Sequence, residues 1–251
     1  SAKDQAAALM FAANEEISHT PPPSWTWYTT DAAEAAVASN LALGLFGPDA
    51  IDCYIRDPGE GNEIVGHRRW LLFPRSQIMG TGDIPPAANY PESGHPAINV
   101  NWVHGDFKPS APAAFIAWPN AGYCPLPLVP QRWSLSYPDA DFASATVTMT
   151  QSTTPVPVQV ISRTDNGYGD NTIVWEPLTL PSSISSDLPF AVTVTGIGGS
   201  GVPVSHSYTV TLFDPLVLGQ SVEITGNASP PVTGSTYTFT PVSQADAYEL
   251  R

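Results

Sequence analysis

Hydrophobic and polar positions follow two different periods along the chain. Up to about residue 75 the apolar side chains recur three or four positions apart, which is typical of helices that bury one face. This spacing predicts four helices, over residues 6–17, 31–46, 48–58 and 63–72. The second is expected to begin at Asp31, with Glu34 as its capping-box partner, and to contain Ser39 and Asn40. We expect Gly47 to end it and Asn62 to cap the fourth helix.

After residue 75 the period changes to that of strands. Short β-branched and aromatic segments at 77–84, 97–103 and 113–118 predict strands that cover the helices. From Arg132 onward apolar and polar positions alternate, and turn residues separate the segments, which is typical of a β-sandwich. The side chains expected in its core are Val147, Val158, Val160, Trp175, Val192, Val194, Val210 and Leu212.

These patterns predict a fold that combines an α/β part with an all-β part. We expect an α/β domain over residues 1–130, whose proline-rich end at 125–130 forms a stiff linker. An immunoglobulin-like or fibronectin-like β-sandwich is expected over 131–217. Residues 218–251 form an extra β segment, with one clear strand at 236–239. This segment either extends the sandwich or begins a further domain.

Composition narrows the function classes. Nine basic residues against 23 acidic ones give a net charge of −14, which excludes the basic footprint of a nucleic-acid binder. Charged residues are only 13% of the chain, and its 27 prolines and 19 glycines indicate many turns. This combination favours a secreted or cell-surface protein. No apolar run approaches the roughly 18 residues of a membrane span, so we expect no transmembrane segment.

The two cysteines, Cys53 and Cys124, leave two possibilities open. They form one disulfide, as in an extracellular protein, or they are two free buried thiols. Two cysteines are too few for a zinc site made of four cysteines.

Two histidines and an acidic loop are the strongest candidates for chemistry. His19 follows the first helix, and His67 lies in the fourth. Each is a candidate general base, metal ligand or buried hydrogen-bonding residue. The loop 57–63 between them is rich in carboxylates, which either orient a histidine or bind a cation. Alternatively, Asp57 ends one helix and Asn62 caps the next.

Three further groups carry a functional and a structural interpretation. Trp25 and Trp27 are a sugar-stacking platform or ordinary buried aromatics. Arg68 and Arg69 hold an anionic ligand or pair with the chain's acids. The segment 165–171 superficially resembles a calcium loop, but its Asn-Gly dipeptide favours a hairpin turn.

Four short motifs, in this order, resemble the bacterial branch of the CAP superfamily (SCP-like extracellular proteins). They are Ser18-His19-Thr20, Ser39-Asn40-Leu41-Ala42, Asn62-x3-Gly66-His67-Arg68 and Met79-Gly80-Thr81-Gly82. The resemblance covers residues 5–85 and extends toward 130. It implies an α-β-α sandwich with a cleft that contains both histidines.

The resemblance also implies roles for four residues. His19 and His67 would be the cleft histidines, and Asp57 is the best match to the family's second acid. Ser39 stands where the family has a glutamate, so the cleft loses one carboxylate. Two imidazoles and at most one carboxylate suit Zn²⁺ and poorly suit Ca²⁺, so we expect His19 and His67 to be the ligands of any metal. Ser39 is a filler for the lost glutamate or, beside a histidine and Asp57, a nucleophile.

Two functions from different classes follow. The first is a non-catalytic protein that binds an extracellular ligand, namely a metal ion, a polysaccharide or a lipid. The alternative is a hydrolase of an extracellular polymer or ester that uses His19, Asp57 and His67. Both hypotheses require the two imidazoles to face one open cleft.

Overall fold

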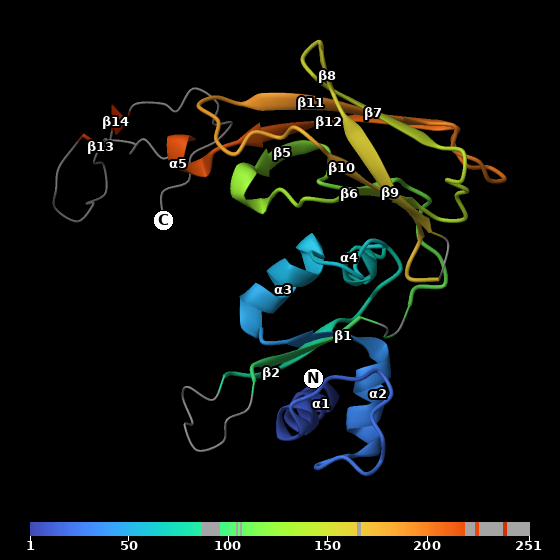
Figure 1. Ribbon diagram of the computed structural model, residues 1–251, viewed down its shortest axis with the longest axis vertical. Coiled ribbons are helices and arrows are strands. Elements are labelled where there is room, and N and C mark those ends of the chain that lie inside the picture. Colours follow the sequence, from blue (N-terminus) through green and yellow to red (C-terminus); the bar gives the residue numbers. More distant parts are fainter. Residues whose placement is uncertain are drawn as a thin grey trace.

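The computed structural model describes residues 1–86, 96–103, 105, 107–164, 167–218, 224–225 and 238–239. Within them the chain combines helices with sheets, as the hydrophobic pattern predicted (Figure 1). A helical region comes first along the chain, and a region of two larger sheets follows it. Every helix among the described residues is too short or too polar to cross a membrane.

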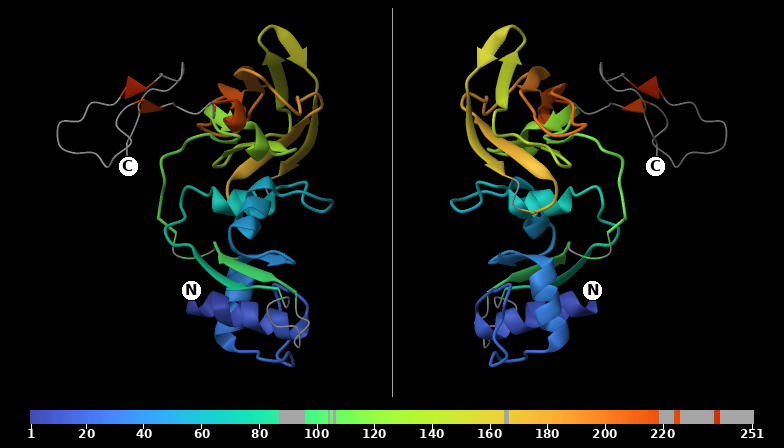
Figure 2. Two further views of the ribbon diagram at one scale, coloured as in Figure 1. Left: turned by 90° about the vertical axis from the view of Figure 1, so that its left-hand side faces the viewer. Right: turned by 90° about the vertical axis from the view of Figure 1, so that its right-hand side faces the viewer.

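The first region has three layers around a small antiparallel sheet. Its strands are β1 (Ser39–Leu43), β3 (Ile98–Trp102) and β2 (Gly80–Ile84), in that order across the sheet. Helices α1 (Ala2–Asn14) and α2 (Thr30–Ala38) pack on one face, and α3 (Gly47–Arg56) and α4 (Gly66–Leu71) lie on the other (Figures 1 and 2). The core between α1, α2 and the sheet consists mainly of alanines, with Met10, Phe11, Leu41, Ile98 and Val100.

The predicted second helix is the main error of the sequence analysis. It ends at Ala38, and the next five residues form strand β1. Leu41 points toward α1 and α2, whereas Ala42 packs on α3, so both faces of the strand are buried. A strand covered on both faces does not alternate apolar with polar, and its pattern resembles that of a buried helix.

The helix caps also differ from those predicted. Helix α2 begins one residue before Asp31, and the Thr29 side chain caps it by accepting the N–H of Ala32. Helix α4 begins after Val65, and Asn62 is therefore not its N-cap. Asn62 instead donates its side-chain N–H to the carbonyl oxygen of Pro58 within the loop.

The second region consists of two sheets that enclose one hydrophobic core. The first sheet has β4 (Ile116–Trp118), β6 (Trp133–Tyr137), β10 (Asn171–Pro177) and β9 (Val158–Thr164), in that order. The second sheet has β5 (Gly122–Pro125), β12 (Ser205–Phe213), β11 (Leu188–Thr195), β7 (Thr146–Gln151) and β8 (Thr154–Val156). Trp133, Trp175 and Phe190 are fully buried between the sheets.

The alternation predicted this core well. Six of the eight expected residues are buried in it, and Val158 and Val160 pack against it while partly exposed. Strands β9 and β10 are antiparallel neighbours joined by the predicted hairpin. Its turn dipeptide starts at Asn166, which lies outside the described residues. An immunoglobulin-like or fibronectin-like identity stays a prediction.

The segment between residues 113 and 130 belongs with the sheets and not with the helices. Strand β4 pairs with β6, and β5 runs parallel to β12, so the predicted strand at 113–118 does not cover the helices. The proline-rich stretch after β5 forms a short 3-10 helix, Leu126–Leu128. Strand pairing thus favours a boundary before residue 116, and the domain division stays a prediction.

The end of the chain is described only in part. Beyond the short helix α5 (Pro215–Leu218), strand β13 (Ile224–Thr225) pairs with β14 (Thr238–Phe239). The predicted strand at 236–239 overlaps β14, and the remainder of 218–251 lies outside the described residues. Both cysteines are free thiols, Cys53 on α3 and Cys124 on β5, so they form no disulfide with each other, but only Cys124 is buried.

A buried arginine joins the two regions. Arg68 of α4 donates to the backbone oxygens of Ile55 and Arg56 in its own region. On the other side it donates to the Arg132 carbonyl oxygen at 2.9 Å and to the Ser134 hydroxyl at 3.1 Å. Burial lowers the pKa of its guanidinium to about 9, so the group remains charged at neutral pH. These acceptors replace the water that the charge has lost.

Candidate ligand-binding cleft

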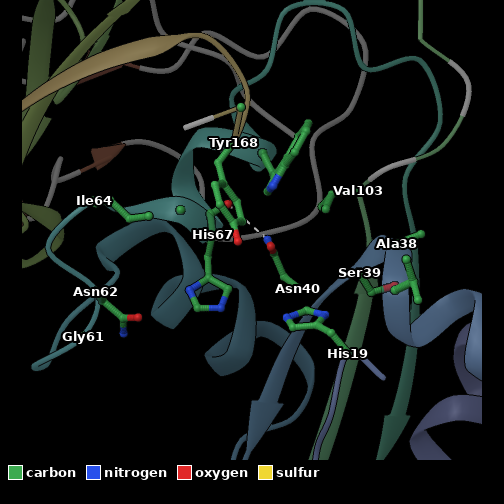
Figure 3. A pocket seen from close by; sticks show the side chains of 14 residues that line it. His19, Ala38, Ser39, Asn40, Gly61, Asn62, Ile64, His67, Val103 and Tyr168 are labelled. Atoms are coloured by element: carbon green, nitrogen blue, oxygen red, sulfur yellow. Dashed lines mark hydrogen bonds between the residues drawn. The ribbon is translucent and has the colours of Figure 1, made fainter. Parts of the chain in front are cut away.

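A cleft of about 600 Å³ lies beside α4, where the first region meets the β9–β10 hairpin of the second (Figure 3). This volume is within the usual range of small-molecule sites. His19, Ser39 and His67 all line it, so the structure brings three of the four predicted site residues to one place. The fourth, Asp57, is buried and contacts His67.

The Asp57 carboxylate holds the His67 ring. Its Oδ1 atom lies 2.8 Å from His67 Nδ1, which confirms the expected contact between this acid and an imidazole. The ring of Tyr54 stacks on the imidazole, with 5.3 Å between ring centroids. The Tyr54 hydroxyl is itself fixed, because it donates to the Asn99 carbonyl oxygen at 3.2 Å. An acid at one edge and an aromatic ring on one face together fix the imidazole plane.

The position of Asp57 follows from local backbone geometry. Asp57 ends α3 in the left-handed conformation, with φ 51°, and its N–H bonds back to the Cys53 carbonyl oxygen. Its Oδ2 atom accepts the backbone N–H of His67 at 3.0 Å, at the start of α4. Two interpretations that the sequence offered as alternatives thus both hold: Asp57 ends one helix and also contacts a histidine.

His19 is held at the same ring nitrogen by a different partner. Its Nδ1 lies 2.8 Å from the carbonyl oxygen of Ala36. Ala36 is in the last turn of α2, where carbonyl groups have no partner within the helix. The imidazole therefore completes the end of α2 and is fixed by it.

These two contacts fix the tautomer of each neutral ring. A carbonyl oxygen and a carboxylate only accept hydrogen bonds, so Nδ1 must carry the proton in both histidines. Each neutral imidazole consequently keeps a lone pair on Nε2. That lone pair is what a general base, a hydrogen-bond acceptor or a metal ligand uses.

The position of Ser39 does not suit a catalytic nucleophile. It opens β1 and is 4% exposed, and its Oγ is buried without a hydrogen-bond partner among the described residues. No histidine contact with Ser39 Oγ is present there to activate it. Its neighbour Asn40 donates its side-chain N–H to the His67 carbonyl oxygen at 3.1 Å, which links β1 to α4.

The two arginines donate hydrogen bonds to backbone oxygens, whereas Trp25 is a packed aromatic, as one of its two interpretations expected. Arg68 and Arg69 are both buried and donate to backbone carbonyl oxygens, that of Asp170 in the case of Arg69. Trp25 packs edge-on against Phe11, and Trp27 is exposed away from the lining of the cleft.

Four polar or aromatic residues of the lining escaped the sequence analysis as site residues. They are Asn40, Asn62, Trp70 and Tyr168. Trp70 follows the His67 motif by three positions, so proximity could have suggested it. Tyr168 is a hundred residues further along the chain, and only the folded structure brings it here.

The donor set fits a metal ion only in part. Among the residues that the structure describes, no three His, Cys, Asp or Glu side chains gather into a group that could hold a metal. Two imidazole nitrogens with fixed partners behind them suit Zn²⁺, which is usually four-coordinate. His19 and His67 would hold such an ion, and water or a bound ligand would complete the coordination.

Comparisons with protein-family models, with curated proteins and with solved structures found no match for this chain. The resemblance to the CAP superfamily therefore stays a prediction that rests on the four motifs.

Proposed function

We propose that this chain is an extracellular, CAP-like binding protein that takes its ligand in the cleft between His19 and His67. One observation carries the proposal: both imidazoles line a single cleft, and each has its Nδ1 atom engaged and its Nε2 lone pair available. Because both rings are already held in place, a ligand can bind their Nε2 atoms with little further loss of side-chain entropy, which favours binding. Zn²⁺ is the ion that these donors suit.

Calorimetric titration of the whole chain with Zn²⁺ tests the metal part of the proposal. We expect binding that His19→Ala and His67→Ala each weaken at least tenfold, because one imidazole alone is a poor site. Binding should also weaken as pH falls, since protons compete with the metal for the imidazoles. His206→Ala is the matched control, because His206 stacks on Phe115 and Tyr208 outside the cleft lining.

The tautomers supply a second and independent measurement. Long-range ¹H–¹⁵N correlation spectra should show the Nδ1–H form for both His19 and His67 when the rings are neutral. Two rings in the Nε2–H form would contradict the proposal. So would zinc binding that survives the loss of both histidines.

A hydrolase is the second candidate, and the Asp57–His67 contact favours it. A carboxylate behind Nδ1 lets Nε2 take a proton from a water molecule that attacks an ester carbonyl carbon. The same nitrogen then returns the proton to the leaving alkoxide. Ser39 has no part in this route, because its Oγ is buried and has no described hydrogen-bond partner.

Turnover of p-nitrophenyl acetate separates the two candidates. The hydrolase reading expects activity that falls by about 10²-fold or more in His67→Ala and persists in Ser39→Ala. Turnover that is no faster than the buffer reaction, or equal in wild type and His67→Ala, would reject the hydrolase and leave binding as the proposed function.

A further inference from the structure

One wall of the cleft comes from the second region. The β9–β10 hairpin places Gly167 and Tyr168 in the lining, opposite the side from which His19 enters (Figure 3). Tyr168 is 47% exposed, so its ring is accessible. Residues Gly169 and Asp170 of the hairpin lie against Arg69 of α4.

The hairpin lies close against α4 at Arg69. The guanidinium of Arg69 donates to the Asp170 carbonyl oxygen at 3.0 Å. Gly169 adopts φ +66°, and a Cβ atom there would lie 3.0 Å from the Arg69 carbonyl oxygen. Only glycine combines that backbone conformation with so close an approach. The position of Tyr168 is therefore set by α4, the helix that carries His67.

Tyr168 and Trp70 form an aromatic wall. Their ring centroids are 6.4 Å apart in an edge-to-face arrangement. Trp70 is held from behind by Phe107, whose ring stacks on it nearly in parallel at 6.0 Å. An aromatic wall that is already packed in place binds apolar surface without having to order its own side chains first.

The rest of the lining mixes apolar side chains, those of Val37, Ala38, Ile64 and Val103, with polar ones that carry no formal charge. None of the described lining residues is Lys, Arg, Asp or Glu; the polar ones are His19, Ser39, Asn40, Asn62, His67 and Tyr168. A charged organic ligand would lose hydration here and find no side chain of opposite formal charge in the described lining.

We infer that the organic ligand of the cleft is a neutral carbohydrate. A sugar ring stacks on the Trp70–Tyr168 wall, and its hydroxyls meet the polar side. Tyr168 is the specificity-determining residue supplied by the second region. Sugars match this lining because their C–H faces are apolar while their edges carry donors and acceptors. An acyl chain would cover the wall but offer no hydrogen bond to the Nε2 atoms of His19 and His67. The inference rests on the proposed function only in treating the cleft as a binding site.

Titration of the whole chain with a panel of neutral oligosaccharides, such as cellotriose, chitotriose and xylotriose, tests the inference. At least one should bind, and Tyr168→Ala should weaken it about tenfold or more, because the ring is lost from the wall. Tyr168→Phe should keep most of the affinity, since the stacking face remains. Tyr123→Ala is the matched control, because Tyr123 is a 62% exposed tyrosine on β5, away from the cleft.

A second variant moves the hairpin without removing the ring. Gly169→Val should displace Tyr168 from α4 and weaken sugar binding as Tyr168→Ala does. Zinc titration of both variants should match wild type, because neither change touches an imidazole. A wild-type chain that binds a neutral sugar but not zinc would contradict the metal proposal and leave this inference standing.

Three results would overturn the inference. One is that no neutral oligosaccharide in the panel binds at millimolar concentration. Another is sugar binding that Tyr168→Ala leaves unchanged. The third is preferential binding of a charged polymer or of phosphatidylcholine vesicles over every neutral sugar.

Discussion

The two regions of this chain hold themselves together in different ways. In the sheet region, large side chains such as Trp133, Trp175 and Phe190 fill one core. In the helical region, the core is mostly alanine, and much of the buried material is polar. Its buried polar and charged side chains, among the described residues, are Asp4, Ser39, Asn40, Asp57, Arg68, Arg69, Asn99 and Asn101.

This difference shows where the geometry of the cleft comes from. Apolar packing is not directional, whereas hydrogen bonds fix both distance and angle. The helical region uses its buried polar groups to orient His67 and to fasten α4, and the sheet region supplies a firm base for the hairpin. A candidate site at the border between them combines directional contacts with a rigid support.

The largest expected effect concerns the arginine that joins the regions. Arg68→Met should lower the free energy of unfolding by about 3–5 kcal/mol, because it leaves buried carbonyl oxygens on both sides without a donor. Urea denaturation followed by tryptophan fluorescence measures this loss. Arg163→Met is the control from the sheet region, where the guanidinium donates to one carbonyl oxygen, that of Ala145. An equal loss of unfolding free energy in Arg68→Met and Arg163→Met would contradict the special role of the buried arginine between the regions.

A smaller effect distinguishes two buried tyrosines. The Tyr54 hydroxyl donates to the Asn99 carbonyl oxygen, whereas the Tyr208 hydroxyl is buried with no described partner. Tyr54→Phe should therefore cost about 1 kcal/mol, and Tyr208→Phe should be neutral or stabilising. Urea denaturation at pH 8 checks both. A larger loss of stability for Tyr208→Phe than for Tyr54→Phe would contradict this difference between the two regions.

The same pair predicts how stability depends on pH. Burial raises the pKa of both phenols above the ordinary value of 10.0. Above that pH the unfolded chain holds fewer protons than the folded chain, so stability falls as pH rises further. Tyr208→Phe should lose less stability than wild type between pH 8 and pH 10.5. An unchanged loss would contradict the burial of this hydroxyl.

The smallest effect concerns the two thiols, one in each region. Burial raises the pKa of Cys53 and of Cys124, so both stay protonated near neutral pH and react slowly. Cys53 is partly exposed and Cys124 is buried, so iodoacetamide at pH 8 should modify Cys53 first. Mass spectrometry of the timed reaction gives the order. Faster modification of Cys124 would indicate that β5 opens more readily than α3.

The contrast between the regions also explains what the sequence could predict. Strands β7, β11 and β12 each bury one face, so their alternation located them and their core residues. Strand β1 is buried on both faces, and its pattern was mistaken for a helix. The contact between Asp57 and His67 was anticipated from the motifs. Tyr168 was not, because its place in the cleft depends on how the hairpin docks on α4.

Asp57 has a consequence for how this chain tolerates change. Its backbone ends α3, its carboxylate holds His67, and its carbonyl oxygen accepts a hydrogen bond from Arg132 of the other region at 3.2 Å. One residue thus has three structural roles: it forms the turn between two helices, orients an imidazole and contributes to the docking of the second region. A random substitution here disturbs two of them together. In a saturation library, position 57 should accept fewer amino acids than position 39, where the buried Ser39 hydroxyl has no described hydrogen-bond partner.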